Sequence, residues 1–254
     1  MQSIKSFFLE MLLKCGLDVQ RTSSVPFGSR WHRDIQFFPN GRNLATVFDV
    51  GANTGQTALT ITRHFRDSRI YSFEPVPSTF KKLCLNVAKY PHIEPICSAL
   101  GAGQGSAKMA AEVLSETNTL VIDAEAKLNP ELLIEVPVDT IDNVCAKRRI
   151  QQINLLKIDT EGYEMNVLKG AQHMFAEKRI EFILAECDFV DRTSEPHGDF
   201  MEIFRYVAAR GFRIVSFYTG GVDNLGWRWG DVLFRQTSDL PPGHVATSAA
   251  GRQP

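Results

Sequence analysis

Short apolar segments alternate with amphipathic ones through most of this chain, and this alternation limits its possible folds more than any other feature. Residues 46–50, 69–73 and 93–98 have the length and apolar character of buried strands, and 55–66 and 77–89 between them have helical spacing. Strands that alternate with helices in this way build a parallel sheet whose two faces are both covered by helices. The sequence therefore predicts an α/β fold with a doubly wound, Rossmann-like sheet.

The alternation is interrupted at residues 101–138 and then resumes. This interruption contains turn-forming residues and two β-like pieces near 106–111 and 132–138, and we interpret it as an insertion at the edge of the sheet. Because only residues 219–230 join the last two strands, too few for a helical crossover, the last strand of the expected seven should run antiparallel to its neighbour. The later elements are expected as helices at 139–149, around 162–176 and at 199–210, and as strands at 153–158, 180–186, 212–218 and 231–236.

The domain organisation follows from the ends of this pattern. With 254 residues the chain can form one α/β domain, which we place at 44–236. Residues 1–43 are expected to form an amphipathic helix and an irregular covering segment, and 237–254 a disordered tail. Lys5, Glu10 and Lys14 interrupt the N-terminal apolar positions, so this helix should be neither a signal peptide nor a membrane span. It should pack on the domain, with a dimer contact or a membrane surface as alternatives.

Charge and cysteine content narrow the class of partner. The formal net charge is −1, and basic and acidic residues are mixed along the chain, which disfavours nucleic acid as a partner. The five cysteines are scattered and include no Cys-x-x-Cys pair, which argues against a disulfide framework and against a zinc site. We therefore expect a cytoplasmic protein without an integral membrane span, and a homodimer is possible.

The loop after the first predicted strand, in the sequence VFDVGANTGQ, lies where open α/β sheets bind ligands. Gly51 and Gly55 let the backbone approach a ligand closely. A nicotinamide dinucleotide would require Gly-x-Gly-x-x-Gly, but Asn53 and Gln56 stand at the second and third of these positions. Asp49 would also place a carboxylate beside the diphosphate. A ligand with a cationic group fits better, and S-adenosylmethionine carries an ammonium and a sulfonium.

The second predicted strand ends in Phe73-Glu74-Pro75, which gives an independent indication. A carboxylate at the end of the neighbouring strand can accept hydrogen bonds from both hydroxyls of a ribose. The alternative is that Asp49 and Glu74 only cap helices. Each stands before a loop rather than at an N-cap position, so we favour ligand binding.

Four blocks in this order resemble the FkbM-type methyltransferases, a branch of the seven-stranded S-adenosylmethionine-dependent enzymes: VFDVGANTGQTALTI, IYSFEPVPSTFKKLCLNV, LLKIDTEGYEMNVLKGA and GDVLF. The resemblance covers about residues 44–236. It implies a ribose site at Glu74. This chain departs from the family at Cys97-Ser98, where related sequences tend to have Asn. The methionine end of the cofactor would be lined by Asp49, Gly51, Asn53 and Gly55, and its adenine end by Pro75, Ser98 and Ala99.

The block Lys157-Ile158-Asp159-Thr160-Glu161-Gly162 should leave its strand beside the methyl donor. Enzymes of this superfamily that methylate planar amino groups commonly have Asn/Asp-Pro-Pro-aromatic here, and its absence favours an oxygen acceptor. Asp159 or Glu161 could accept the proton of a hydroxyl. Alternatively, Asp159 binds the loop or the cofactor ammonium, and Glu161 caps the next helix. A cation held by Asp159, Glu161 and Glu186 is a third possibility, but we assign no metal.

Some other residues could also belong to a site. His197, after the strand at 180–186, is a further candidate for the base, whereas His173 is expected on a helix surface. Trp227-Arg228-Trp229 could stack on a sugar, although we slightly favour aromatic side chains that fill a hairpin. Arg30-Trp31-His32-Arg33 is expected to be a solvated basic turn, with a lid or an anion site as the alternative.

These inferences lead to one expected function. The chain is expected to be a cytoplasmic S-adenosylmethionine-dependent O-methyltransferase. The resemblance suggests as acceptor a hydroxyl of a sugar or glycan, such as a lipo-oligosaccharide, or of a polyketide-like small molecule. The alternatives are a non-catalytic S-adenosylmethionine-binding scaffold and a methyltransferase that acts on protein or RNA.

Overall fold

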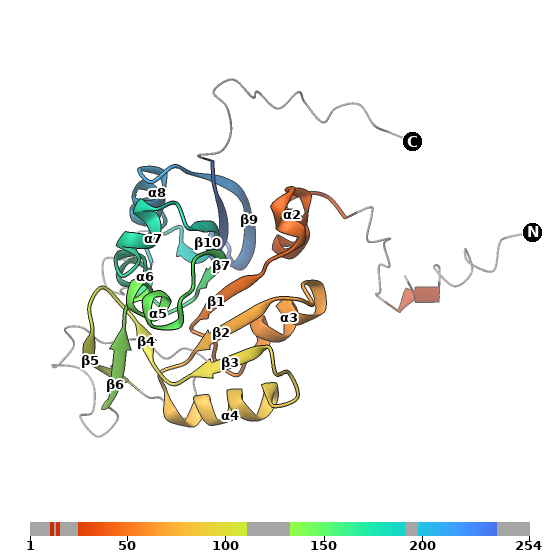
Figure 1. Cartoon of the computed structure of the whole chain (residues 1–254). Coiled ribbons are helices and arrows are strands. Elements are labelled where there is room, and N and C mark those ends of the chain that lie inside the picture. The colour runs from red at the N-terminus through yellow and green to blue at the C-terminus, as the bar shows by residue number, and fades with distance from the viewer. Residues whose placement is uncertain (1–10, 13, 16–24, 111–132, 191–197, 238–254) are drawn as a thin grey trace, which may run out of the picture.

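Figure 1 shows the computed structural model of the chain, in which residues 11, 12, 14, 15, 25–110, 133–190 and 198–237 are described. A seven-stranded sheet with the order β3-β2-β1-β7-β8-β10-β9 forms its centre. β10 is antiparallel to β8 and β9, and the other pairs are parallel, as the sequence predicted. The strands are β1 (Thr46–Val50), β2 (Arg69–Phe73), β3 (Ile93–Ile96), β7 (Ile153–Ile158), β8 (Ile180–Asp188), β9 (Phe212–Asp223) and β10 (Gly226–Gln236).

Helices cover both faces of this sheet because its strands are apolar on both sides. In β1, Val47 packs into the core on one face and Phe48 into the core on the other, as the alternation of a strand requires. The first face is covered by α2 (Trp31–Phe37), α3 (Gln56–His64) and α4 (Pro77–Val87). The second face is covered by α5 (Ile141–Arg148), α6 (Glu164–Lys169), α7 (Gln172–Ala176) and α8 (Phe200–Ala208). None of the described helices is long and apolar enough to cross a membrane.

A second, three-stranded sheet corrects the prediction of an edge insertion. β4 (Ala99–Leu100), β6 (Leu133–Asp139) and β5 (Gly105–Ala110) form it in the order β4-β6-β5, and it does not extend the main sheet. The two β-like pieces were therefore predicted correctly, but their place was wrong. They pair with each other because Met109 and Val136 then bury a common apolar face against Val76, which precedes α4. The residues between them, 111–132, lie outside the described part.

Three other expectations need correction. The described part of the covering segment is not irregular, since it contains α2 and the short helix η2 (Asn40–Arg42). The helix expected around 162–176 is two helices, because Gly170 approaches the backbone of Gly101 so closely that a Cβ would lie 2.1 Å from its carbonyl oxygen. The expected loop 219–230 is mostly strand: the glycines at 220 and 221 lie under the indole of Trp229 and are not part of a turn. The predicted N-terminal helix and tail fall almost entirely outside the described residues.

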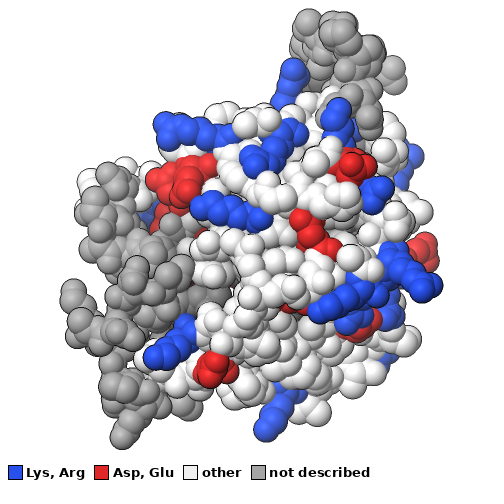
Figure 2. Space-filling view, turned by 60° about the vertical axis from the view of Figure 1, so that its left-hand side comes forward, with Lys and Arg blue, Asp and Glu red and all other residues white. Residues whose placement is uncertain are grey.

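Basic and acidic side chains are mixed over the face shown in Figure 2, among the residues that are coloured there. On this face the Lys and Arg side chains are separated by uncharged surface and by Asp and Glu.

Candidate active site

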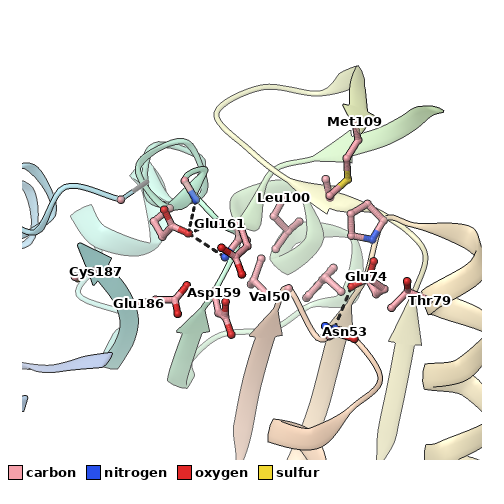
Figure 3. Close-up of a pocket in the computed structure, with 18 of the residues that line it drawn as sticks. Val50, Asn53, Glu74, Thr79, Leu100, Met109, Asp159, Glu161, Glu186 and Cys187 are labelled. Carbon is pink, nitrogen blue, oxygen red and sulfur yellow. Dashed lines mark hydrogen bonds between the residues drawn. The ribbon is translucent and has the colours of Figure 1, made fainter. Parts of the chain in front are cut away.

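A cavity of about 480 Å³ opens at the carboxyl ends of β1, β2 and β7. The strand order reverses between β1 and β7, which is where doubly wound sheets bind ligands. Ligand pockets usually have volumes of roughly 300–1,000 Å³, so this cavity could enclose a nucleoside-sized ligand and part of an acceptor. Figure 3 shows the cavity from the side, with the carboxylates of β7 and β8 at one end and Glu74, Thr79 and Met109 at the other.

The glycine loop folds against the end of β2. The N–H groups of Gly51 and Ala52 both donate to the carbonyl oxygen of Phe73, at 3.1 and 2.9 Å. Gly51 has φ +75°, and a Cβ on it would lie 1.7 Å from the carbonyl oxygen of Asp159. Glycine is therefore required here so that the two loops can meet. Gly51 and Asn53 line the cavity as predicted, whereas Gly55 does not and instead packs beside Leu83.

Glu74 connects the second strand to the glycine loop. Its Oε2 accepts a hydrogen bond from the N–H of Asn53 at 3.0 Å, and its Oε1 accepts one from the N–H of Val76 at 2.9 Å (Figure 3). The residue is 6% exposed and lines the cavity. Burial raises the pKa of Glu74 to about 7, although the two N–H groups oppose this shift. Each carboxylate oxygen can accept a further hydrogen bond, so Glu74 could also bind a ligand hydroxyl.

The far end of the cavity combines predicted and unpredicted residues. Pro75, Ser98 and Ala99, which the resemblance assigned to the adenine, all line this end. Thr79 and Met109 also line it and were not predicted. Met109 comes from the second sheet, so only the tertiary structure brings it to the cavity.

Lys157 is buried beneath the cavity among carboxylates. Its Nζ lies 3.0 Å from Oδ2 of Asp159, 3.6 Å from Oδ1 of Asp49 and 3.3 Å from the carbonyl oxygen of Gly51. Burial alone would lower the pKa of Lys157, but the charges of Asp159 and Asp49 raise it above its ordinary value. Burial also raises the pKa of Asp49, which Lys157 opposes. Asp159 directly follows β7, and its side chain lies on the same side of the sheet as that of Lys157, which pairs with it.

Asp159, Glu161 and Glu186 meet at the other end of the cavity. Carboxylate oxygens of the three lie within 4.8 Å of one another. Burial, followed by the charges of Asp159 and Glu161, raises the pKa of Glu186 to about 9. The cluster therefore favours the protonated form of Glu186. The sequence analysis named these three residues together only as possible ligands of a cation, and Glu186 lies within β8 rather than after it.

A family model described as the Methyltransferase FkbM domain matches residues 49–214 of this chain. The chain belongs to the FkbM methyltransferase family. This confirms the resemblance seen in the four sequence blocks, and the match extends from Asp49 in β1 into β9. The sheet of this FkbM-family protein has the Rossmann-like arrangement expected for its class.

Three curated relatives are methyltransferases by name. Hexuronic acid methyltransferase AglP of Haloferax volcanii is 25% identical over 141 residues, which are 55% of this chain and 54% of AglP, so the match spans about half of that protein. Methyltransferase 1 of Beauveria bassiana is 25% identical and is matched over 71% of this chain and 76% of its own length. The 31-O-demethyl-FK506 methyltransferase FkbM of Streptomyces tacrolimicus is 25% identical over 67% of this chain and 73% of that protein.

Solved structures give more distant likenesses. An rRNA methylase from Streptococcus thermophilus superposes with a TM-score of 0.47 and 10% identity, over 81% of this chain and 93% of that one. Aeropyrum pernix fibrillarin, with S-adenosyl-L-methionine bound, superposes with a TM-score of 0.44 and 14% identity, over 85% of this chain and 84% of that one. We draw no conclusion about activity from likenesses at this level.

Not every predicted residue of this FkbM-family chain reaches the cavity. Asp49 is fully buried on the α3 side of the sheet and lies behind the cavity wall, where Ser72 donates a hydrogen bond of 3.4 Å to it. The tetrapeptide at 30–33 begins α2 rather than forming a solvated turn, and none of its residues is among those that line the cavity. His173 lies exposed on α7 as expected. His197 lies outside the described residues.

The aromatic segment at 227–229 has two roles. Trp227 packs near Phe189 and Phe217 and so fills the hairpin, as we favoured. Arg228 and Trp229 line the cavity, which links the hairpin to the site. The sequence did not single out Glu164, although its carboxylate lies in the cavity wall, 1% exposed.

Proposed function

We propose that this protein is an S-adenosylmethionine-dependent O-methyltransferase. The charge of the cavity is the observation that carries this proposal. Among the described residues that line it, six have carboxylates, and Arg228 is the one cationic side chain. Such a wall favours a ligand with ammonium and sulfonium groups and disfavours the diphosphate of a dinucleotide. Membership of the FkbM methyltransferase family gives independent support.

The residues around the cavity fit this ligand. Glu74 has free acceptor capacity for ribose hydroxyls, and Pro75, Ser98, Ala99 and Met109 offer a mainly apolar surface for the adenine. Gly51 borders the methionine end, where its backbone meets that of Asp159, and Asn53 lies beside Glu74. Asp49 acts behind the wall, where it and Asp159 share Lys157.

The protein's own residues then have distinct roles in the transfer. S-adenosylmethionine supplies an electrophilic methyl group when it is bound. Glu161 accepts the proton of the attacking hydroxyl, because it lines the cavity beside Asp159 and Glu186. Asp159 orients the acceptor while it is paired with Lys157 at 3.0 Å. Glu186, whose pKa is raised by burial and by the neighbouring carboxylates, donates a hydrogen bond in its protonated form to one of these carboxylates or to the acceptor.

The lining of the cavity and the names of the relatives support one class of acceptor. Carboxylates that accept hydroxyl hydrogen bonds and the indole of Trp229 suit a sugar or another polyhydroxylated molecule. The names hexuronic acid methyltransferase and 31-O-demethyl-FK506 methyltransferase support a glycan or a polyketide-like acceptor, respectively.

All five cysteines are free, which supports a reducing, cytoplasmic location.

Two measurements test this proposal. Calorimetry should show that the protein binds S-adenosylmethionine and does not bind a nicotinamide dinucleotide. A panel of sugars, lipid-linked glycans and macrolides should then contain an acceptor that releases S-adenosylhomocysteine. Binding of the dinucleotide alone would refute the proposal. Cofactor binding without product from any acceptor would instead support the scaffold.

A further inference from the structure

Glu164, the third residue of the Gly162-Tyr163-Glu164 triplet, holds the loop that carries Glu161. One of its oxygens, Oε1, accepts three hydrogen bonds: from the N–H of Thr160 at 2.9 Å, from the hydroxyl of Thr160 at 2.9 Å and from the N–H of Gly162 at 3.1 Å. Glu164 is 1% exposed, so water does not compete for these bonds.

The loop needs such support because its backbone is unusual. Glu161 has φ +53° and Gly162 has φ +103°, so two successive residues lie in the left-handed region. A non-glycine residue in this region is sterically strained and persists where its surroundings hold it. The hydrogen bonds that Glu164 accepts come from Thr160, the residue before Glu161, and from Gly162, the residue after it.

The other half of the loop is anchored independently. The N–H of Asp159 donates to the carbonyl oxygen of Val50 at 3.1 Å, which continues the pairing of β7 with β1. Asp159 also keeps its ion pair with Lys157. Loss of Glu164 should therefore release Glu161 and leave Asp159 and the glycine loop in place.

The room for this carboxylate depends on Gly198. Oε2 of Glu164 is buried and has no hydrogen-bond partner among the described residues, and a Cβ on Gly198 would lie 2.5 Å from it. Gly198 precedes α8, and its carbonyl oxygen accepts from the N–H of Asp188 at 2.9 Å. A methyl group at residue 198, which is distant from Glu164 in the sequence, would thus displace the Glu164 carboxylate.

We infer that Glu164 is a positioning residue that fixes the pose of Glu161 for methyl transfer. This inference rests on the proposed function. Glu164 contributes through its oxygen acceptor and not through its charge, because all three bonds end on one oxygen that a glutamine would also supply.

The test compares Glu164→Ala with Glu164→Gln. Glu164→Ala should lower kcat by about 10- to 100-fold, the loss expected when a reacting group is displaced by about 1 Å. The Kd for S-adenosylmethionine should change by less than about threefold, because Asp159 and the glycine loop keep their anchors. Glu164→Gln should restore kcat to within about threefold of the wild type. An equal loss in both variants, or an unchanged kcat in Glu164→Ala, would overturn the inference.

Gly198→Ala provides a second perturbation that leaves Glu164 chemically intact. It should lower kcat in the same way as Glu164→Ala, whereas Gly103→Ala, where a Cβ meets nothing within 4 Å, should not. Hydrogen exchange of the Thr160 and Gly162 amides reports on the loop without any acceptor, and it should be faster in Glu164→Ala. Wild-type exchange rates in that variant would overturn the inference. A wild-type protein that binds S-adenosylmethionine but transfers no methyl group would overturn the proposed function, and the exchange rates would still show whether Glu164 holds the loop.

Discussion

The amine of Lys157 lies 3.0 Å from Oδ2 of Asp159 and 3.6 Å from Oδ1 of Asp49, beneath the floor of the cavity. Lys157 and Asp49 are both buried, at 5% and 0% exposure. Removal of one partner from such a group leaves a buried charge without compensation. This one amine therefore connects the strand that begins the glycine loop with the strand that carries the proposed proton acceptor.

Substitution of Lys157 should destabilise the protein. We expect Lys157→Met to lower the free energy of unfolding by about 3–5 kcal/mol, since Asp49 and Asp159 then repel each other. Urea unfolding followed by tryptophan fluorescence measures this change. The double variant Lys157→Met/Asp49→Asn should recover part of the loss. An unchanged midpoint in Lys157→Met would show that the amine contributes nothing to stability.

A methyl group on Gly51 should separate the two loops. Gly51→Ala places a Cβ 1.7 Å from the carbonyl oxygen of Asp159 and strains a backbone with φ +75°, so we expect a loss of more than about 2 kcal/mol of stability. Thermal unfolding of Gly51→Ala and of the control Gly103→Ala measures it. The control should stay within about 0.5 kcal/mol of the wild type. Similar melting temperatures for both variants would contradict the close approach of the loops.

The affinity for S-adenosylmethionine should depend on pH through Glu74. The pKa of Glu74 is raised to about 7 by burial, so the side chain holds a proton below pH 7 and is ionised above it. Only the ionised form attracts the cationic ligand and offers all its acceptors to the ribose. Binding should therefore tighten by about tenfold as the pH rises from about 6 to 8.

Glu74→Gln is the control for this pH effect. It should bind more weakly at pH 8 and should lose the part of the pH dependence centred near 7. Asp231 and Glu186, with pKa values raised by burial to about 6 and about 9, titrate in both proteins, so the comparison isolates Glu74. A parallel pH profile in the variant would assign the effect to another group.

Glu161→Gln should separate proton transfer from cofactor binding. If Glu161 accepts the hydroxyl proton, kcat should fall by about 10²- to 10⁴-fold, the usual contribution of general base catalysis. The Kd for S-adenosylmethionine should stay within about threefold. Glu177→Gln, at an exposed carboxylate paired with Arg179, is the matched control. Full turnover in Glu161→Gln would remove this residue from the role.

Chelation should leave the transfer rate unchanged. Asp159 is already paired with Lys157 at 3.0 Å, and this amine competes with a divalent cation for the carboxylate. We expect the same kcat before and after dialysis against EDTA. A decrease that Mg²⁺ or Mn²⁺ restores would show that Asp159, Glu161 and Glu186 bind a cation.

The strands of the main sheet could be predicted because each is a short apolar segment bounded by turn-forming or charged residues. The carboxylates at 74, 159, 161 and 186 could be predicted as neighbours, since the carboxyl ends of parallel strands share one edge. The position of Asp49 could also have been predicted. Asp49 is two residues after Val47, so both side chains point to the same face of β1, and Asp49 lies opposite Lys157 in the register of β1 and β7. This places Asp49 on the face of the sheet that helices cover.

Residues contributed by tertiary contacts could not be predicted. Met109 reaches the cavity only because β5 and β6 form a separate sheet with β4, and no periodicity distinguishes this from an extended edge. Arg228 and Trp229 reach the cavity because the β9–β10 hairpin continues through the glycine-containing segment that was expected to be a loop. Glu164 had a sequence signal, since it follows Thr160 by four residues, but its three donors depend on the left-handed backbone between them.

The position of β10 has a consequence for the order in which this protein can assemble. β10 is the last of the described strands along the chain, yet it lies between β8 and β9, and β9 is paired with β10 alone in the described sheet. A nascent chain that ends before Gly226 therefore leaves the edge of β8 open and β9 without a neighbour. An open, apolar edge of this kind can pair with another chain. Ribosomes that stall or stop late in this message would thus release aggregation-prone fragments, even though such fragments contain nearly every residue of the cavity.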